Sequence, residues 1–368
     1  METGFLPNAG LQTLLDALHQ AGYRCVGPRV RDGAIVYDTL RDISELPQGI
    51  VDVQAPGEYR LEKSANPRHF SWANGPQALK PFLFAAREPL WRSGRDARGE
   101  LRFVELAPPG ESLAFVGARA CDLAALRLQD RHFLEGAFPD SGYAARRKSI
   151  FLVAVHCTHP ADTCFCASTG DGPRATQEFD IALSELDDGY LVQHGSDKGR
   201  ALAAKLPLVP ATDKQRMSAD GDIQDAARRQ TRRLPSRNLR AALFANLGHP
   251  RWDNIAERCL SCGNCTSVCP TCYCHSVADE TALDGRESLH LRLWDSCFTQ
   301  KHSYIHGMTL RPDTRTRYRQ WLTHKLGSWH DQFGRSGCVG CGRCIAWCPV
   351  GIDITQEAGE ICGGAAHD

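Results

Sequence analysis

Two segments of the chain repeat the same arrangement of four cysteines followed by a proline. Residues 259–270 and residues 338–349 both have the spacing C-x2-C-x2-C-x3-C-P. Three cysteines two residues apart can wrap a compact turn around one cubane, and the proline turns the fourth thiolate toward a second cluster. The small Gly263 and Gly342 let the backbone come close to the cluster sulfides. The repeat therefore predicts two [4Fe–4S] clusters.

The fourth cysteine of each copy is expected to bind the cluster of the other copy, as in two-cluster ferredoxins. The alternative is a pair of zinc knuckles, but a structural zinc needs four ligands in one place, whereas each copy has a three-plus-one layout ending in proline. The iron–sulfur interpretation is therefore favoured. Its predicted ligands are Cys259, Cys262, Cys265 and Cys348 for one cluster, and Cys338, Cys341, Cys344 and Cys269 for the other.

The cysteine content of the whole chain supports metal binding. There are 17 cysteines in 368 residues. Disulfide scaffolds are short and secreted, whereas this chain is long and shows no secretory signal, so we expect a cytoplasmic protein that uses thiols as ligands. The 43 basic and 43 acidic residues exclude a nucleic-acid binder driven by bulk positive charge. No apolar run is long enough for a membrane span.

The pattern before the cysteine motifs predicts an N-terminal α/β domain with a mostly parallel sheet. Residues 113–116 and 150–155 are apolar runs typical of buried strands, and helices are expected at 11–22 and 123–134. The fold class is thus mixed α+β and α/β, ending in an α-helical di-cluster ferredoxin-type domain. The expected domains are an N-terminal α/β segment of unknown role at 1–110, its continuation with a candidate third cluster at 111–222, and the domain with two [4Fe–4S] clusters at 223–368.

The separation of the two motifs indicates a helical domain. Between Cys269 and Cys338 lie 68 residues, far more than in a small ferredoxin. Residues 290–294 and 316–326 are interpreted as helical, so we expect an α-helical domain and not a compact β-hairpin ferredoxin.

Three arginines adjoin the motifs and are either ordinary surface residues or charges that offset the negative clusters and favour their reduced form. They are Arg258, Arg335 and Arg343.

A second group of cysteines predicts a third [4Fe–4S] cluster. Cys121 follows the strand at 113–116, and Cys157 follows the strand at 150–155. In a parallel sheet both would emerge at the same carboxyl edge, where open α/β folds place their ligands. The alternative is that these are buried thiols, since free cysteine packs as a small hydrophobe. The candidate ligands are Cys121, Cys157, Cys164 and Cys166.

Several motifs of bond chemistry are missing from the sequence. No G-x-G-x-x-G follows a strand, no P-loop is present, and no spare C-x-x-C pair remains for a nickel–iron centre. We therefore expect no flavin or nucleotide on this chain and no catalytic residues. Of the five other thiols, Cys25 and Cys362 are expected to be plain thiols, and Cys272, Cys274 and Cys297 are expected to pack near the clusters. The alternative is that these three hold a further group, but no fourth ligand for it is obvious in the sequence.

Four short segments together resemble a known family. They are GARACD at 117–122, Cys157 with TCFC at 163–166, HPRW at 249–252 and CPTCYC at 269–274. In these segments the chain resembles the iron–sulfur β subunit of cytoplasmic NAD(P)-linked sulfhydrogenases, which are nickel–iron hydrogenases with sulfur reductase activity. The corresponding iron–sulfur subunit of anaerobic sulfite reductase is similar to the same family. The resemblance extends over roughly residues 110–350, and GARACD and TCFC are its specific part.

The resemblance implies a non-catalytic electron-transfer subunit of a multi-subunit oxidoreductase. Its expected partners are a flavin subunit that meets NAD(P)H and the small and large hydrogenase subunits. It also supports cluster binding by the GARACD and TCFC cysteines. An alternative is the iron–sulfur subunit of an anaerobic sulfite reductase, which would pass electrons to a sirohaem partner. A third hypothesis, an iron–sulfur sensor of oxygen, would require a DNA-binding element, and the neutral net charge gives no sign of one.

Overall fold

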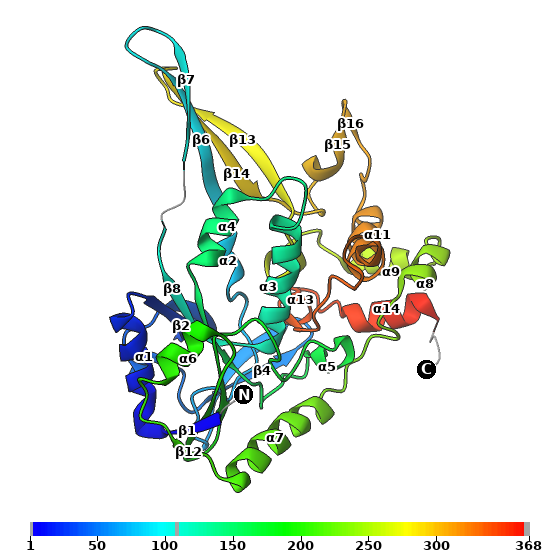
Figure 1. Cartoon of the computed structure of the whole chain (residues 1–368). Helices are drawn as coiled ribbons and strands as arrows, with labels where there is room; N and C mark the ends of the chain where they lie inside the picture. Colours follow the sequence, from blue (N-terminus) through cyan, green and yellow to red (C-terminus); the bar gives the residue numbers. More distant parts are fainter. Residues whose placement is uncertain (1–2, 107–109, 364–368) are drawn as a thin grey trace.

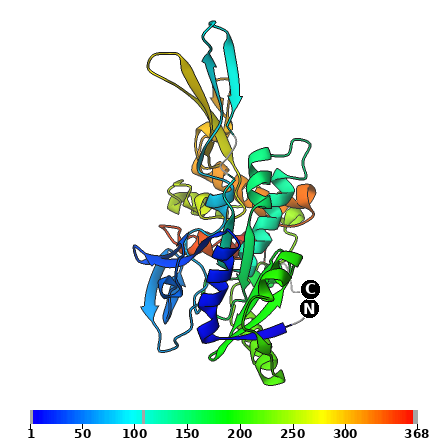
Figure 2. The same cartoon turned by 60° about the vertical axis from the view of Figure 1, so that its left-hand side comes forward.

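The computed structural model describes residues 3–106 and 110–363. Figure 1 shows three parts: a large sheet with its helices at the lower left, a β arm rising above it, and a group of helices at the right. The arm stands away from the body in Figure 2 as well. Among the described residues, no helix combines the length and the apolar character that a bilayer span requires.

The large sheet has eight strands in the order β12-β1-β11-β10-β9-β8-β2-β3. Its four central strands run parallel, and the outer pairings are antiparallel. β8 and β9 are apolar and wholly buried, as parallel strands covered on both faces require. The sheet is therefore mixed, and the predicted parallel order holds only for its centre. The strands are β1 Thr3–Pro7, β2 Arg24–Arg31, β3 Ala34–Thr39, β8 Leu113–Ala118, β9 Phe151–Val155, β10 Ile181–Glu185, β11 Gly189–His194 and β12 Val209–Pro210.

Helices cover both faces of this sheet. Successive residues of β8 enter two different cores, since Val116 packs in the core with α1 and α6 and Phe115 packs in the core with α3 and α4. The sheet is thus the middle of a three-layer body, in which the predicted first helix is present. The helices of this part are α1 Leu11–Gln20, α2 Lys80–Leu83, α3 Ala120–Phe133, α4 Ser141–Lys148, α5 Cys166–Thr169, α6 Asp197–Ala203 and α7 Asp213–Arg228, with 3-10 turns η1 Asn8–Gly10 and η2 Ile43–Glu45.

The arm joins distant parts of the chain in one antiparallel sheet, ordered β13-β14-β6-β7. The expectation of a helix at 290–294 is wrong, because these residues lie in β14. Leu289, Leu291 and Leu293 alternate with polar residues, which is the period of a strand, and the stretch is too short for helical periodicity to compete. The strands are β6 Arg87–Arg95, β7 Leu101–Glu105, β13 His275–Thr281 and β14 Glu287–Trp294. The region between the two cysteine motifs is therefore not purely helical.

The helices at the right surround a separate core. The predicted helix at 316–326 is present as α11, which continues into a π-helical turn, η4, and then α12. The elements are α8 Arg240–Ala245, α9 Arg251–Arg258, α10 Asn264–Ser267, α11 Thr314–Thr323, η4 His324–Ser328, α12 Trp329–Phe333, α13 Arg343–Ala346 and α14 Ile354–Cys362, with η3 Lys301–Ser303 and the hairpin β15 Tyr304–Ile305 and β16 Met308–Thr309.

The N-terminal segment reaches this helical part through a small hairpin. The hairpin consists of β4, Ile50–Ala55, and β5, Glu58–Lys63. The backbone N–H of Gly57 donates to the carbonyl of Ile345 at 3.1 Å, and Tyr59 stacks on Trp347 with ring centroids 4.9 Å apart. The first hundred residues therefore help to hold the second cysteine motif in place.

A buried ion pair fixes the base of the arm. Glu88 of β6 is 8% exposed and pairs with Arg146 of α4 at 2.6 Å and with Arg292 of β14. Removing one partner leaves buried charges without compensation, so Glu88→Ala should lower the free energy of unfolding by about 3–5 kcal/mol. Urea unfolding followed by circular dichroism measures this change.

The matched control is Glu280→Ala, because Glu280 of β13 pairs with Arg87 of β6 at 2.6 Å with both side chains more than half exposed. An exposed pair contributes about 0–1 kcal/mol. Equal losses in the two variants would contradict a structural role for the buried pair.

Candidate iron–sulfur sites

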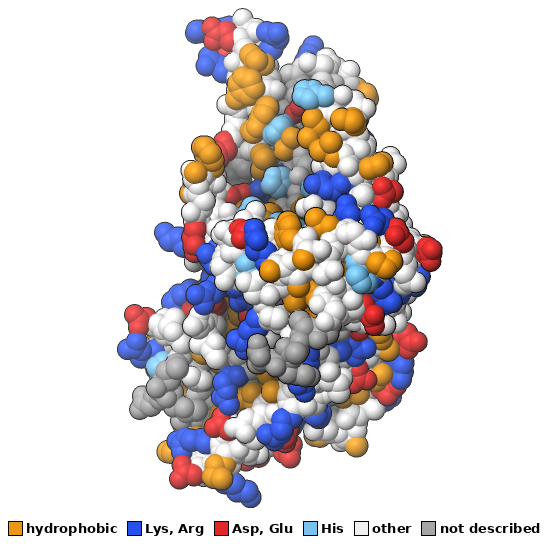
Figure 3. Space-filling model, turned by 90° about the vertical axis from the view of Figure 1, so that its right-hand side faces the viewer, with side chains coloured by type: hydrophobic (Ala, Val, Ile, Leu, Met, Phe, Trp, Pro, Cys, Tyr) orange, Lys and Arg blue, Asp and Glu red, His pale blue; other side chains and the backbone are white. Residues whose placement is uncertain are grey.

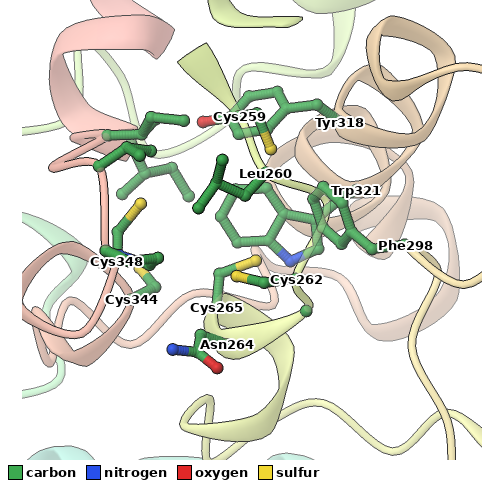
Figure 4. A pocket seen from close by; sticks show the side chains of 15 residues that line it. Cys259, Leu260, Cys262, Asn264, Cys265, Phe298, Tyr318, Trp321, Cys344 and Cys348 are labelled. Atoms are coloured by element: carbon green, nitrogen blue, oxygen red, sulfur yellow. The ribbon is translucent and has the colours of Figure 1, made fainter.

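The first site consists of Cys259, Cys262, Cys265 and Cys348. All four border one cavity, and Figure 4 shows Cys348 facing the three other cysteines across it. Since Cys348 belongs to the second motif, the structure brings together four thiols from both motifs. The walls are largely apolar and include Phe298, Tyr318, Trp321, Ile352 and Ile354.

The second site consists of Cys338, Cys341, Cys344 and Cys269. Each of the first three lies within electrostatic range of Cys269. Burial raises the pKa of Cys338 to about 12, and the charges of Cys341 and Cys269 add to this effect. Four thiols that interact in this way cannot all ionise unless cations compensate them, and the irons of a cluster would do so. The donor set therefore fits such a cluster.

The ligands of a cubane bind four separate irons and so lie further apart than the ligands of one ion. Within residues 3–106 and 110–363, no three His, Cys, Asp or Glu side chains are placed to hold a single metal ion. The two sites adjoin each other, because Cys344 borders the cavity of the first site and interacts electrostatically with Cys265.

Glycines of the second motif allow a very close contact with the loop at 163–166. A Cβ atom on Gly340 would lie 2.5 Å from the backbone nitrogen of Cys166, and one on Gly342 would lie 2.5 Å from the carbonyl oxygen of Thr163. Both glycines also have positive φ values, 63° and 73°, that other residues rarely adopt. From the sequence we expected the missing side chain of Gly342 to let the backbone approach the cluster. In the structure it lets the backbone approach the loop at 163–166.

The third site consists of Cys121, Cys157, Cys164 and Cys166. Cys121 lies in the first turn of α3 after β8, and Cys157 lies two residues beyond β9. Cys166 interacts electrostatically with each of the other three, and the structure therefore gathers the group around it. Cys121 and Cys166 also share an apolar cluster with Cys341 of the second site. The second and third sites are therefore neighbours.

Buried donors without partners lie beside the third site. Arg119 is 1% exposed, and its Nε and Nη1 atoms have no hydrogen-bond partner among the described residues. The Nη2 atom of Arg119 donates to the carbonyl of Phe70 at 2.9 Å, and the positive charge of the guanidinium favours the ionised form of the Cys157 thiol. Unpaired buried donors are costly unless an acceptor is supplied. The environment of these thiols is therefore suited to a negatively charged group.

The N-terminal segment contacts the second and third sites directly. The Asn74 amide donates to the carbonyl of Cys341 at 2.8 Å, and the Arg343 guanidinium donates to the carbonyl of Gly75 at 2.9 Å. No motif in the sequence indicated these contacts, because single asparagine and glycine residues far from the cysteines carry no recognisable spacing.

Each of the three arginines expected to offset cluster charge already has a carboxylate partner. Arg258 pairs with Glu357 at 2.7 Å, Arg335 with Asp171 at 2.6 Å and Arg343 with Asp122 at 2.8 Å. The charges of Arg335 and Arg343 are therefore largely neutralised, whereas Arg258 shares Glu357 with Arg251.

Two lysines that the sequence did not indicate lie beside Cys269. The Lys325 Nζ is 3.5 Å from the Cys269 sulfur, and the Lys80 Nζ is 3.3 Å from the Cys269 carbonyl oxygen. A hydrogen bond from Cys272, together with the charge of Lys325, holds the pKa of Cys269 well below its ordinary value.

The five other thiols divide into two kinds. Cys25 and Cys362 are buried in apolar cores, as expected. The other three, Cys272, Cys274 and Cys297, lie near the motif cysteines. Cys272 interacts electrostatically with Cys269, and Cys297 interacts electrostatically with Cys265.

The crossed arrangement generates a test. Cys348→Ala should remove the cluster held by Cys259, Cys262 and Cys265, because that cavity loses its fourth thiol. The cluster of the motif in which Cys348 lies should persist. Iron analysis should show a loss of about four irons per chain. Cys362→Ala, which removes a core thiol, is the control and should retain all iron. A holoprotein structure with Cys348 and Cys341 on one cluster would refute the crossed arrangement.

Comparison with known proteins identifies an iron–sulfur region and a family. Residues 258–352 match the family model described as a 4Fe-4S dicluster domain. A curated relative, sulfhydrogenase 2 subunit beta of Pyrococcus furiosus, is 32% identical over 285 residues, which cover 77% of this chain and 82% of the relative. No solved structure matches the chain. The similarity to the relative extends well beyond the dicluster domain, into the part that carries the third site. The chain therefore belongs to the sulfhydrogenase β-subunit family.

Proposed function

We propose that this chain is the electron-transfer subunit of a multi-subunit oxidoreductase of the sulfhydrogenase type. The observation that carries the proposal is the row formed by the three cysteine sites. Cys166 of the third site shares an apolar cluster with Cys341 of the second, and Cys344 of the second interacts electrostatically with Cys265 of the first. When bound, [4Fe–4S] clusters supply reversible one-electron transfer. Cysteines that hold such groups in a row would suit a relay.

One end of the row is open to solvent. Cys262 of the first site is exposed, and the neighbouring Leu260 is 64% exposed. The thiols at the other end, Cys121, Cys164 and Cys166, are buried. We therefore place the exchange of electrons with one partner at the Leu260–Cys262 surface.

Further apolar surface lies on the same part of the chain. The β15–β16 hairpin, at the upper right of Figure 1, carries exposed Tyr304, Ile305 and Met308. Figure 3 views the molecule from that side and shows apolar side chains gathered in the upper half of the face, among basic side chains and histidines. Such surfaces often form protein interfaces. This supports a chain that works within a complex.

The proposed partners follow from the number of electrons that each carrier transfers. NAD(P)H delivers a hydride, so a flavin must separate the two electrons before single-electron carriers accept them. This sequence has no dinucleotide fingerprint. We therefore assign flavin and NAD(P)H to a partner protein, and hydrogen chemistry to small and large hydrogenase subunits. The name of the relative, sulfhydrogenase 2 subunit beta, favours this set of partners over a sirohaem protein.

Three clusters per chain are part of the proposal. Cys121, Cys157, Cys164 and Cys166 would hold the third, and the unpaired donors of Arg119 support a negatively charged group beside them. Anaerobically prepared protein should then contain about 12 irons and as many sulfides per chain. Cys166→Ala, which removes the central thiol of the third site, should lower both to about eight.

The matched control is Cys25→Ala, because Cys25 is a buried thiol in the core of the large sheet. It should leave the iron content unchanged. About eight irons in the fully loaded unmodified protein would refute the third cluster and leave the other two in place.

The division of labour gives a separate test. The isolated, cluster-loaded chain should be reduced by dithionite, a one-electron donor, yet stay oxidised with NADH or NADPH. Adding the flavin-bearing partner should restore reduction by the nicotinamide, as followed by bleaching of the visible iron–sulfur absorption. Catalytic oxidation of NADPH by the chain alone would show that the relay assignment is wrong.

A further inference from the structure

We propose that Lys325 and Lys80 make the second site the easiest of the three to reduce, by placing two uncompensated positive charges beside its ligand Cys269. This inference rests on the proposed function, because it assumes that the second site holds a cluster. In this inference the two lysines are positioning residues that set the reduction potential of the cluster at the second site.

Both lysines are buried at Cys269 and do not face solvent. Lys325 is 4% exposed and Lys80 is 7% exposed. The Lys325 Nζ donates to Thr271 Oγ1 at 2.8 Å and lies 3.5 Å from the Cys269 sulfur. The Lys80 Nζ lies 3.3 Å from the Cys269 carbonyl oxygen and 3.9 Å from the centre of the Trp294 ring.

The surrounding structure fixes the Lys325 ammonium in position. Thr271 is fully buried, and its hydroxyl donates to the carbonyl of Gly337 at 2.6 Å. The backbone N–H of Gly337 in turn donates to the carbonyl of Lys325 at 2.8 Å. Lys325 lies in the π-helical turn η4, an irregularity that is frequent at functional positions. The segment that leads into the second motif is thus tied to this lysine.

Neither ammonium has a carboxylate within ion-pair distance in the part of the chain that the structure describes. A buried charge without a counter-charge is costly, so an anion is expected beside it. The thiols of Cys269 and Cys272 act on both ammonium groups, Cys338 also acts on Lys325, and Cys274 also acts on Lys80.

The other two sites differ in charge. At the first site, Arg251 and Arg258 share the fully buried Glu357, which leaves one positive charge in excess. At the third site, Arg119 is one buried cation and the buried Asp52 acts on Cys164, whereas Asp122 and Asp171 are already paired with Arg343 and Arg335. The second site, with two lysines that have no carboxylate partner among the described residues, therefore has the largest excess of positive charge of the three. Adding one electron to a cluster adds negative charge, so nearby cations stabilise the reduced form and raise the reduction potential.

The test is a redox titration of the cluster-loaded chain, with dithionite as reductant, viologen mediators and electron paramagnetic resonance (EPR) as the readout. Lys325→Met should disfavour reduction of the highest-potential cluster at least tenfold, which is a fall of about 59 mV for a one-electron couple. Lys80→Met should shift the same signal in the same direction. Lys325→Arg keeps the positive charge, so its highest reduction potential should stay close to that of the unmodified protein.

Two further variants complete the design. Lys205→Met removes an exposed lysine and should leave every potential unchanged. Cys348→Ala removes the first site and assigns the signals: the highest-potential signal should remain. Its loss in that variant would overturn the inference, because the first site would then be the easiest to reduce.

The remaining outcomes separate the inference from the proposed function. Loaded lysine variants with unchanged potentials would overturn the role of the lysines and leave the relay standing. Loss of clusters from both methionine variants, with normal loading in Lys325→Arg, would mean that the lysines hold the fold and do not set a potential, and would also overturn it. An unmodified chain that binds no cluster would refute the proposed function and the inference together.

Discussion

The contact between the second cysteine motif and the loop at 163–166 is the interaction on which the rest of the structure depends. Gly340 and Gly342 have no side chains, and the loop occupies the space that a Cβ atom would need. Because of this contact, thiols at the carboxyl edge of the large sheet lie against thiols of the dicluster region. A bulkier residue at either glycine would push the two parts of the molecule apart and separate the third site from the second.

The N-terminal segment belongs to the same assembly. Its β4–β5 hairpin, Asn74 and Gly75 all bond to residues of the second motif, and Lys80 reaches the last cysteine of the first motif. The arm adds a second connection, because β6 comes from the chain between strands β3 and β8 of the large sheet, and β14 comes from the chain between the two cysteine motifs. The dicluster region is thus held by both ends of the chain, and the residues between its two motifs include β13 and β14 of the arm.

Local signals in the sequence identified the cysteine groups, the buried central strands and the first helix. Cysteine spacing is a local property, and a wholly buried apolar run such as 151–155 has few other interpretations. Contacts that depend on tertiary packing were not accessible. Apolar and polar residues alternate in β14, but the stretch is too short for this pattern to be distinguished from that of a helix. Its partner strand β6 lies some two hundred residues earlier in the chain. Lys80 and Lys325 become important only when folding places them at Cys269. The arginines that looked relevant beside the motifs are paired with Glu357, Asp171 and Asp122, and none of these pairings can be read from neighbouring positions.

The central claim is that three iron–sulfur sites form a row with the second site in the middle. The magnetic coupling between reduced clusters tests it most directly, because unpaired spins interact strongly only at short range. In the fully reduced, cluster-loaded chain, EPR should show broadened, spin-coupled signals, and Cys338→Ser, which disturbs the middle site, should replace them with the narrow signals of two isolated clusters. Coupled signals that persist after the middle cluster is lost, or three uncoupled signals in the unmodified protein, would contradict the row.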